Sequence, residues 1–436
     1  MTTETTAIDR FKLAVNRGDA VELRRVLSES AEARSAINEP LFGFNSPALV
    51  SVAGDGNVDI VDTLLEFGAD PNRKSSWWAG GFHPLHAASG DVSDRLIAAG
   101  AVPDACAAAR LGRTDILERI LDEDPSRVHE RGGDGQTPLH FARSRDVVDL
   151  LLARGADPDA RDLDHRSSPA EWMIGDVIVP EDSRIDLARY LVERGASVDI
   201  FLAAALGLPD KASKILERDP GALSLRTSQG DYDEKAPSSY HIYQWTLGPN
   251  LSPMQVAARR GNESTLDVMR RYANPTELLL LACHLGQGDE ARALVAKHPE
   301  LVSEMKDQHR AVADEAWASN ASAVAVLMEL GFDPSVPGPQ GANALHCASW
   351  EGSVECVMAI LTYSSGRALI DVREPSYGGT PLSWCSHGSV NCGNPKADHA
   401  TVARLLIAAG SQVTEDMRDW GSPGFQSAIA ETLESR

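Results

Sequence analysis

Residues 137–158 read Thr-Pro-Leu-His-Phe-Ala-Arg-Ser-Arg-Asp-Val-Val-Asp-Leu-Leu-Leu-Ala-Arg-Gly-Ala-Asp-Pro, and this stretch decides the fold. Thr137 followed by Pro138 suits the cap and first turn of a helix. The apolar residues from Val147 onward continue into a second helical stretch. Gly155 can take the left-handed conformation that ends such a helix. The stretch therefore predicts a pair of short helices.

The same pattern recurs along the chain. Further copies of the opening begin at His83, Asn343 and Thr380, and glycine-containing stops occur at Gly68, Gly100, Gly195, Gly331 and Gly410. A second, degenerate type keeps the helix pair and loses the opening turn; it begins at Phe11, Cys106, Leu202 and Leu281. Both types together give about twelve repeats between residues 8 and 413. Such a unit cannot bury its apolar face alone, so it must stack on its neighbours.

These segments resemble ankyrin repeats, and the resemblance covers more than nine tenths of the chain. It implies an all-α ankyrin-repeat solenoid, expected here as one array over residues 1–436. Residues 8–39 would form an N-terminal capping repeat, residues 40–413 the stacked repeats, and residues 414–436 a C-terminal cap or tail. In the family, the concave side carries the turn tips and the exposed positions of the first helices, and partners usually bind there.

Composition narrows the range of partners. The 436 residues are 43% hydrophobic and 24% charged, as in ordinary globular proteins. Against 41 Lys and Arg stand 63 Asp and Glu, which gives a net charge of −22. This charge disfavours nucleic acid and anionic membranes as partners. No uninterrupted apolar stretch approaches the length of a membrane span, and the start has no basic and apolar signal pattern, so neither a membrane segment nor a secretory signal is expected.

The chemistry-bearing residues indicate no cofactor or metal. The six cysteines are scattered without a CxxC pair, which favours reduced core thiols and a cytoplasmic location. The spacing of Cys385, His387, Cys392 and His399 matches no common zinc pattern. Asp162, Asp164 and His165 form an acidic turn, but acidic residues are ordinary at ankyrin turns. Phosphate-binding loops and nucleophile elbows are not found in the sequence.

Several turns are longer than stacking requires. The enlarged ones span residues 72–81, 162–183, 227–250, 375–379 and 388–398. Long loops inside a compact array are usually functional or disordered, and aromatic residues argue against disorder. Two alternatives remain for the aromatic side chains: they cover the seams between repeats, or they bind a partner. The binding candidates in these loops are Trp77, Trp78, Tyr243 and Trp245.

The family pattern also projects side chains onto the concave face, just before the turn that ends each first helix. The positions are Arg110, Ser144, Arg259, Arg260, His284, Trp350, Glu351 and His387, with Tyr377 on a neighbouring turn. Arg, His and Trp collect in the C-terminal half and are typical anchors for a partner or ligand. By contrast, the resemblance implies that His86, His140 and His346 brace turns by hydrogen bonds to backbone. Ser383 replaces the corresponding histidine, and its turn is expected to be held less tightly.

Two functions are compatible with these features. The favoured one is a cytoplasmic scaffold that holds a protein partner with its concave face and aromatic loops. The alternative is a small-molecule-binding protein or an enzyme whose cavity the aromatic loops close, with His387, His284 and Glu351 as acid or base. Because about three repeats of roughly 10 Å each separate the two histidines, each would need a partner from a loop. Residues 377–389 also resemble a variant found in bacterial ankyrin proteins, which implies a bacterial source.

Overall fold

The computed structural model describes residues 6–175, 184–227, 241–305 and 307–434. The chain divides into two compact units: unit 1 comprises Met1–Leu206 and Arg226–Leu251, and unit 2 comprises Gly207–Leu225 and Ser252–Arg436. Each unit is a stack of short helices, and the only β-pairing among the described residues is one isolated bridge, Phe42 to Ser46. The all-α ankyrin-type fold predicted from the repeats is confirmed. A single array over residues 1–436 stays a prediction.

Unit 1 contains helix pairs from α1 to α13, followed by α15. Its helices are α1 (Ala7–Arg17), α2 (Ala20–Glu29), α3 (Ala31–Ser35), α4 (Ala48–Val52), α5 (Val58–Glu66), α6 (Gly90–Ala98), α7 (Ala105–Arg110), α8 (Thr114–Glu123), α9 (Pro138–Phe141), α10 (Arg145–Ala153), α11 (Pro169–Met173), α12 (Ile185–Glu193), α13 (Ile200–Leu206) and α15 (His241–Thr246). Short 3₁₀ helices lie in its turns: η1 (Gly43–Asn45), η2 (Pro84–His86), η3 (Pro125–His129) and η4 (Gly133–Gly135).

Unit 2 continues the same architecture. Its helices are α14 (Pro209–Arg218), α16 (Pro253–Arg259), α17 (Glu263–Arg270), α18 (Pro275–His284), α19 (Gly288–Lys297), α20 (Glu300–Glu304), α21 (Ala311–Trp317), α22 (Ala321–Glu329), α23 (Ala344–Trp350), α24 (Val354–Leu361), α25 (Ser364–Arg367), α26 (Pro381–Asn391), α27 (His399–Ala408) and α28 (Pro423–Glu434). Its 3₁₀ helices are η6 (Pro220–Ser224), η7 (Asp307–Arg310), η8 (Pro339–Gly341) and η9 (Glu415–Asp419).

Local sequence explains why these helices form. Ser144 caps α10 by accepting a hydrogen bond from the backbone of Val147, whose side chain is buried with the other apolar residues of one helix face. Proline occupies the first turn of α9, α11, α16, α18 and α26. The predicted stop residues Gly68 and Gly155 have φ of 93° and 89°, a region that favours glycine.

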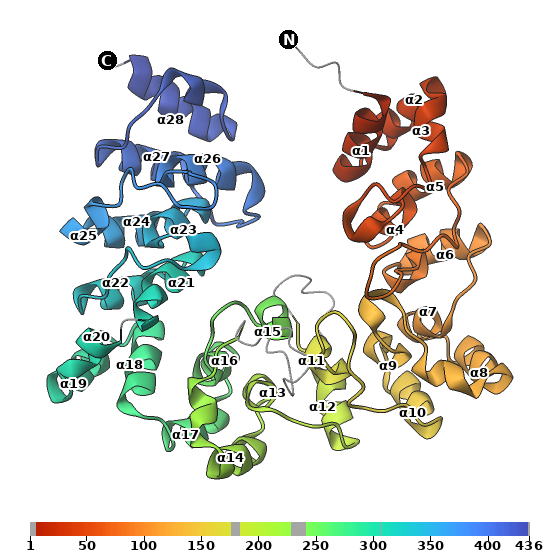
Figure 1. The fold of residues 1–436 in the computed structure, drawn as a ribbon, viewed down its shortest axis with the longest axis horizontal. Helices are drawn as coiled ribbons and strands as arrows, with labels where there is room; N and C mark the ends of the chain where they lie inside the picture. Colours follow the sequence, from red (N-terminus) through yellow and green to blue (C-terminus); the bar gives the residue numbers. More distant parts are fainter. Residues whose placement is uncertain (1–5, 176–183, 228–240, 306, 435–436) are drawn as a thin grey trace. The chain divides into compact units, whose positions relative to one another are not determined.

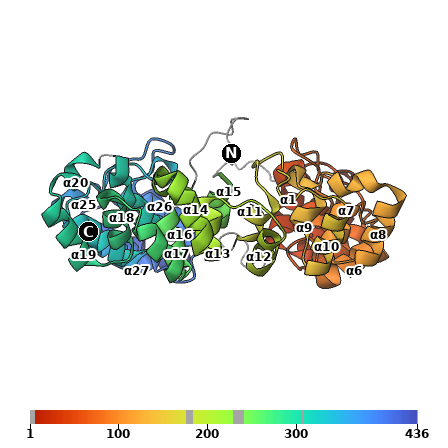
Figure 2. The same ribbon diagram turned by 90° about the horizontal axis from the view of Figure 1, so that it is seen from below.

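Two layers of helices make up the C-terminal part of unit 2. The first helices α18, α21, α23 and α26 form one column and their partners α19, α22, α24 and α27 form the other (Figure 1, Figure 2). Helix α21 packs on both α22 and α23, and α23 packs on both α24 and α26. A continuous apolar core runs through these contacts, and α28 closes its end with Phe425 and Ile429 buried. The first helices of successive repeats therefore present the same positions side by side.

Parts of two enlarged turns lie outside the described residues. They are residues 176–183 in the turn over 162–183, and residues 228–240, which include Tyr240, in the turn over 227–250. The described ends of these turns belong to unit 1. There α15 packs against α11.

The start of α11 contains a buried carboxyl whose titration should affect stability. Glu171 accepts a hydrogen bond from the backbone N–H of Ser168, 2.8 Å away. Burial, followed by the negative charge of Asp199, raises the pKa of Glu171 to about 8 from an ordinary 4.5. Between about pH 4.5 and pH 8, Glu171 therefore stays protonated in the folded state, whereas in the unfolded state it has lost its proton. Hence the contribution of Glu171 to folding stability is largest below about pH 4.5 and falls as the pH rises toward 8.

Glu171→Gln removes this charge and keeps the capping acceptor. We expect the variant to be more stable than wild type at pH 8.5 by on the order of 2 kcal/mol, with the difference vanishing near pH 4. Denaturant unfolding at several pH values measures it. Glu193→Gln, at an exposed position of α12, is the control and should leave the pH dependence unchanged. A Glu171→Gln variant with the wild-type pH dependence would contradict the assignment.

Candidate functional site

Four successive first helices of unit 2 place a side chain at the same structural position. Each of these side chains belongs to the residue two positions before a residue with left-handed backbone conformation. The left-handed residues are Gly261, Gly286, Ser319 and Gly352, with φ of 66°, 67°, 54° and 63°. The four side chains, called the inner row below, are Arg259, His284, Trp317 and Trp350. They belong to α16, α18, α21 and α23. The repeat pattern predicts Arg259, His284 and Trp350 at these positions, whereas Trp317 was not predicted.

Aromatic rings dominate the C-terminal end of the inner row. The rings of Trp317 and Trp350 are nearly parallel, with centroids 6.2 Å apart and planes inclined by 6°. The buried Trp384 of α26 packs edge-on against both, at 6.5 Å and 5.9 Å. His387 packs edge-on against Trp350 at 5.2 Å and is exposed. Trp317 and Trp350 are half-buried, so each combines a fixed ring with an accessible surface.

Gly388 brings α26 close to this aromatic cluster. A Cβ atom at Gly388 would lie 2.1 Å from the backbone oxygen of Trp350, so only glycine permits the approach. The sequence predicted an enlarged turn over residues 388–398, and its start is corrected: the turn begins only after Asn391 and occupies residues 392–398. Helix α26 continues to Asn391, because Gly388 serves helix packing and does not adopt a left-handed turn. His387 consequently lies inside the helix rather than at its end.

Gly388→Ala should destabilise unit 2 by about 1–3 kcal/mol, because the added methyl group must push α26 away from α23. Thermal unfolding followed by tryptophan fluorescence measures the effect at the affected contact. Val390→Ala on an exposed position of the same helix is the matched control and should change stability by no more than about 0.5 kcal/mol. Equal stability of the two variants would rule out the close packing at Gly388.

Inside the inner row, His284 belongs to a buried polar network. Its Nδ1 lies 2.7 Å from Oε1 of Glu315, and both residues are buried. The other oxygen of Glu315 accepts a hydrogen bond of 2.8 Å from Asn320, and Gln255 donates to Oε1 over 3.3 Å. The guanidinium Nε of Arg259 faces Nε2 of His284 at 3.4 Å. Burial lowers the pKa of Arg259 below its usual value, and the negative charge of Glu315 opposes this shift only in part.

This network corrects one expectation about His284. A partner was expected from a loop, whereas Glu315 lies on the neighbouring first helix α21. At the position of Glu315 the adjacent repeats carry Ala257, Ala282 and Ala348, so the carboxylate replaces a small packing residue. The imidazole is therefore oriented by a carboxylate on one side and covered by Arg259 on the other. Such a buried polar network holds the inner row rigid at Arg259 and His284.

The remaining candidates of unit 2 lie apart from that network. Glu351 is half-buried, and burial raises its pKa to about 7. Tyr377 is 77% exposed on a turn whose N–H groups at Ser376, Tyr377 and Gly379 donate to Glu374. Glu374 thus stabilises the turn that was expected to be loose without a histidine at position 383. In the described residues no hydrogen bond or ion pair joins His284, Glu351 and His387 into one acid–base group.

The aromatic loops of unit 1 have different environments. Trp78 is 68% exposed, and Trp77 packs edge-on against Phe44 at 5.2 Å. Trp245 is 45% exposed at the end of α15. Tyr243 is fully buried against Phe201 and donates its hydroxyl to Asp199 at 3.0 Å. The expectation that Tyr243 offers a binding surface is corrected accordingly, because the side chain packs in the interior.

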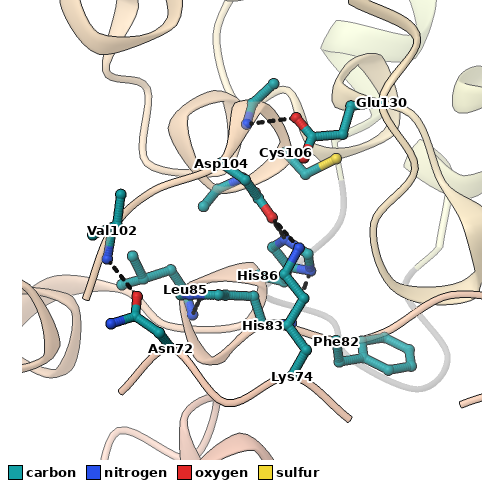
Figure 3. Close-up of polar contacts among 12 residues, drawn as sticks. Asn72, Lys74, Phe82, His83, Leu85, His86, Val102, Asp104, Cys106 and Glu130 are labelled. Atoms are coloured by element: carbon teal, nitrogen blue, oxygen red, sulfur yellow. Dashed lines mark hydrogen bonds and ion pairs between the residues drawn. The ribbon is translucent and has the colours of Figure 1, made fainter. Parts of the chain in front are cut away.

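A buried cluster around His86 stabilises a turn of unit 1 (Figure 3). Nδ1 of His86 accepts a hydrogen bond from the backbone of His83, and Nε2 lies 3.0 Å from Asp104. Asp104 also pairs with Lys74 at 2.7 Å, and these two partners hold its pKa well below the usual range despite burial. The buried thiol of Cys106 has its pKa raised by burial. These groups satisfy one another and brace the turn.

The other two motif histidines act as predicted. Nε2 of His140 lies 3.0 Å from the backbone oxygen of Ser167, and Nε2 of His346 lies 3.0 Å from that of Gly379. Each histidine therefore links its own helix to the turn of the following repeat. This role is confirmed for His140 and His346. His86 also accepts a backbone hydrogen bond, from His83 of its own turn, but its Nε2 pairs with the carboxylate of Asp104 instead of with backbone. The six cysteines are all free.

Stacked helix pairs, braced turns and equivalent positions on successive first helices define a helical-repeat protein. The Ankyrin repeat family model matches residues 134–163. An ANK repeat-containing protein of Caenorhabditis elegans is 30% identical over 117 residues, which cover 23% of this chain and 16% of that protein. The mouse ankyrin repeat and SAM domain-containing protein 6 is 30% identical over 127 residues, covering 28% and 14%. The Arabidopsis thaliana serine/threonine-protein kinase VIK is 35% identical over 95 residues, covering 17% and 22%.

The chain is an ankyrin-repeat protein. Its similarity spans less than a quarter of the length of each of these relatives. The ankyrin repeat is a module of protein–protein interaction, and the family model places such a repeat at residues 134–163 of this chain. Across the described residues, none of the helices has the length and apolar character needed to cross a membrane.

Proposed function

We propose that the chain is a protein-binding scaffold that holds an extended segment of a partner protein along the inner row. The observation that carries the proposal is the equivalent placement of Arg259, His284, Trp317 and Trp350 on four consecutive first helices. Half-buried tryptophans next to a rigid polar network resemble the hot spots of protein interfaces, where a few aromatic and arginine side chains supply most of the affinity. The exposed His387 extends this surface.

Charge favours a basic partner segment. The chain carries a net charge of −22, which attracts Lys- and Arg-rich segments and speeds their association. A cationic side chain can also stack on the accessible face of Trp317 or Trp350. Nucleic acid is disfavoured by the same charge. The six free cysteines support a cytoplasmic location, which we include in the proposal together with the bacterial source.

The alternative, a small-molecule site closed by the aromatic loops, has less support. A cavity of about 510 Å³ lies in unit 2, and its lining includes Asp371, Arg373, Ser383 and Trp420. Trp77, Trp78 and Trp245 are not among its lining residues. We therefore place the protein-binding function first.

Selection of phage-displayed random peptides on the full chain tests the proposal. We expect enrichment of peptides that carry Lys or Arg, with binding that weakens as salt is raised and that changes the tryptophan fluorescence. Peptide enrichment without charge preference, or peptide binding that Trp350→Ala leaves unchanged, would overturn it.

A further inference from the structure

Two turns of unit 1 bring a histidine and two carboxylates to one place. The turn before α9 carries Asp134 at its tip, with φ of 57°, and the turn before α11 carries Asp164 and His165. The backbone oxygen of Asp134 accepts hydrogen bonds from the N–H groups of Leu163 at 2.9 Å and Asp164 at 3.1 Å. These bonds fix the turns to each other. One possible ligand atom from each of Asp134, Asp164 and His165 then lies within 4.8 Å of the others.

Among the described residues, the carboxylate of Asp134 has no hydrogen-bond donor at Oδ1 and no cationic side chain beside it. The residue is 7% exposed, and its Oδ1 is buried without a hydrogen-bond partner. Burial first, and then the negative charges of Asp164 and Asp162, raise the pKa of Asp134 to about 7. The indole N–H of Trp77 is close enough to oppose this shift, although its Nε1 makes no hydrogen bond of normal geometry. A buried acceptor without a donor is costly and would be stabilised by a cation.

His165 is oriented as a ligand. Its Nε2 lies 3.7 Å from Oδ2 of Asp164, and its Nδ1 lies 3.1 Å from Nδ1 of His241 on α15. The two imidazole rings stack with centroids 5.1 Å apart. Burial lowers the pKa of both histidines. If Nδ1 of His165 donates to His241, its Nε2 lone pair is directed toward the carboxylates, and His241 orients the ring as outer-shell partners of metal-bound histidines do.

We propose that Asp134, Asp164 and His165 bind a divalent transition-metal ion, with zinc as the best fit. Imidazole nitrogen together with carboxylate oxygen is a common zinc ligand set. Ligand atoms about 2.0–2.1 Å from a tetrahedral zinc ion lie about 3.4 Å apart, close to the 3.7 Å between His165 and Asp164. The ligand atom of Asp134 lies within 4.8 Å of both. Three protein ligands leave a fourth position for water.

The cluster of His86, Asp104 and Cys106 shows why this inference is specific. Its ligand atoms satisfy the same distance criterion. However, the ammonium group of Lys74 already pairs with Asp104, which in turn binds His86 and caps α7. A cation there would have to displace Lys74. At Asp134 no cationic side chain contacts the carboxylate among the described residues, so the charge is uncompensated.

Zinc titration of the EDTA-treated full chain tests the site, with a chromophoric chelator as competitor. We expect one zinc ion per chain to bind with micromolar or tighter affinity, and Asp134→Asn to weaken binding at least about tenfold. Asp164→Asn should have a similar effect. Asp146→Asn, at an exposed position of α10, removes the same charge outside the cluster and should bind zinc as wild type does.

Thermal unfolding in EDTA separates loss of the site from loss of the fold. Asp134→Asn should be at least as stable as wild type there, because it removes repulsion between carboxylates, and zinc should raise the melting temperature of wild type only. The proposal is overturned if wild type binds no zinc in the micromolar range. It is equally overturned if Asp134→Asn and Asp164→Asn bind zinc as tightly as Asp146→Asn, which would indicate adventitious binding to acidic surface.

Discussion

Glu315→Ala should lower the free energy of unfolding by about 3–5 kcal/mol, the cost of breaking a buried pair from one side. Glu315 accepts hydrogen bonds from Gln255 and Asn320 and pairs with Nδ1 of His284. Alanine leaves the buried side chains of His284 and Gln255 without this acceptor, whereas the half-buried Asn320 keeps its hydrogen bond to the backbone oxygen of His284. Because α18 and α21 are adjacent helices, the loss should loosen both. Trp317 lies two residues further along α21 and reports it by fluorescence.

Two variants calibrate this result. Glu315→Gln keeps an acceptor for His284 and nearly the same volume, so it should cost markedly less than alanine. Glu329→Ala removes a carboxylate of the same type from an exposed pair with Arg292, which should contribute no more than about 1 kcal/mol. If Glu315→Ala costs no more than Glu329→Ala, the network does not stabilise unit 2. Denaturant unfolding of all three variants decides between these outcomes.

The sequence predicts the architecture well because the repeat signals are local. A Thr-Pro opening, an apolar helix face and a stop glycine lie within about 22 residues of one another, as at 137–158, and each has its own physical cause. The bracing roles of His140 and His346 follow from the same motif. Trp317 was missed for a local reason as well. Ser319 takes the left-handed position that glycine occupies in the neighbouring repeats, so this repeat lacks the glycine that shows where its first helix ends.

Contacts between repeats are harder to predict. His284 and Glu315 are 31 residues apart in the sequence, and Asp134 and Asp164 are 30 apart, so their approach depends on how neighbouring repeats stack. A single sequence does not show how neighbouring repeats stack. Gly388 illustrates the converse: glycine near the end of a first helix suggested a turn, whereas close approach to the backbone of Trp350 requires it. Burial of Tyr243 likewise results from contacts with Asp199 and Phe201, which lie far away in the sequence.

Trp350→Ala should weaken binding of the selected peptides by about 30-fold or more, the effect expected when a hot-spot tryptophan is removed. Its ring is held by Trp317, Trp384 and His387 but keeps an accessible face, so it can bind without an entropic cost of ordering. Trp78→Ala is the matched control: it removes an equally large and more exposed ring from unit 1 and should leave peptide affinity unchanged. Fluorescence polarisation with labelled peptides measures both.

Folding must be measured alongside binding, because Trp350 also contributes to packing. A fully buried tryptophan would cost about 3–5 kcal/mol on truncation, and a half-buried one should cost roughly half of that. The remaining stability leaves unit 2 folded, so a loss of peptide binding at low temperature reports on the interface. A folded Trp350→Ala variant that binds the peptides as tightly as Trp78→Ala would place the binding surface elsewhere. A variant that melts as if a fully buried ring were lost would show that the accessible face of Trp350 is too small to hold a partner.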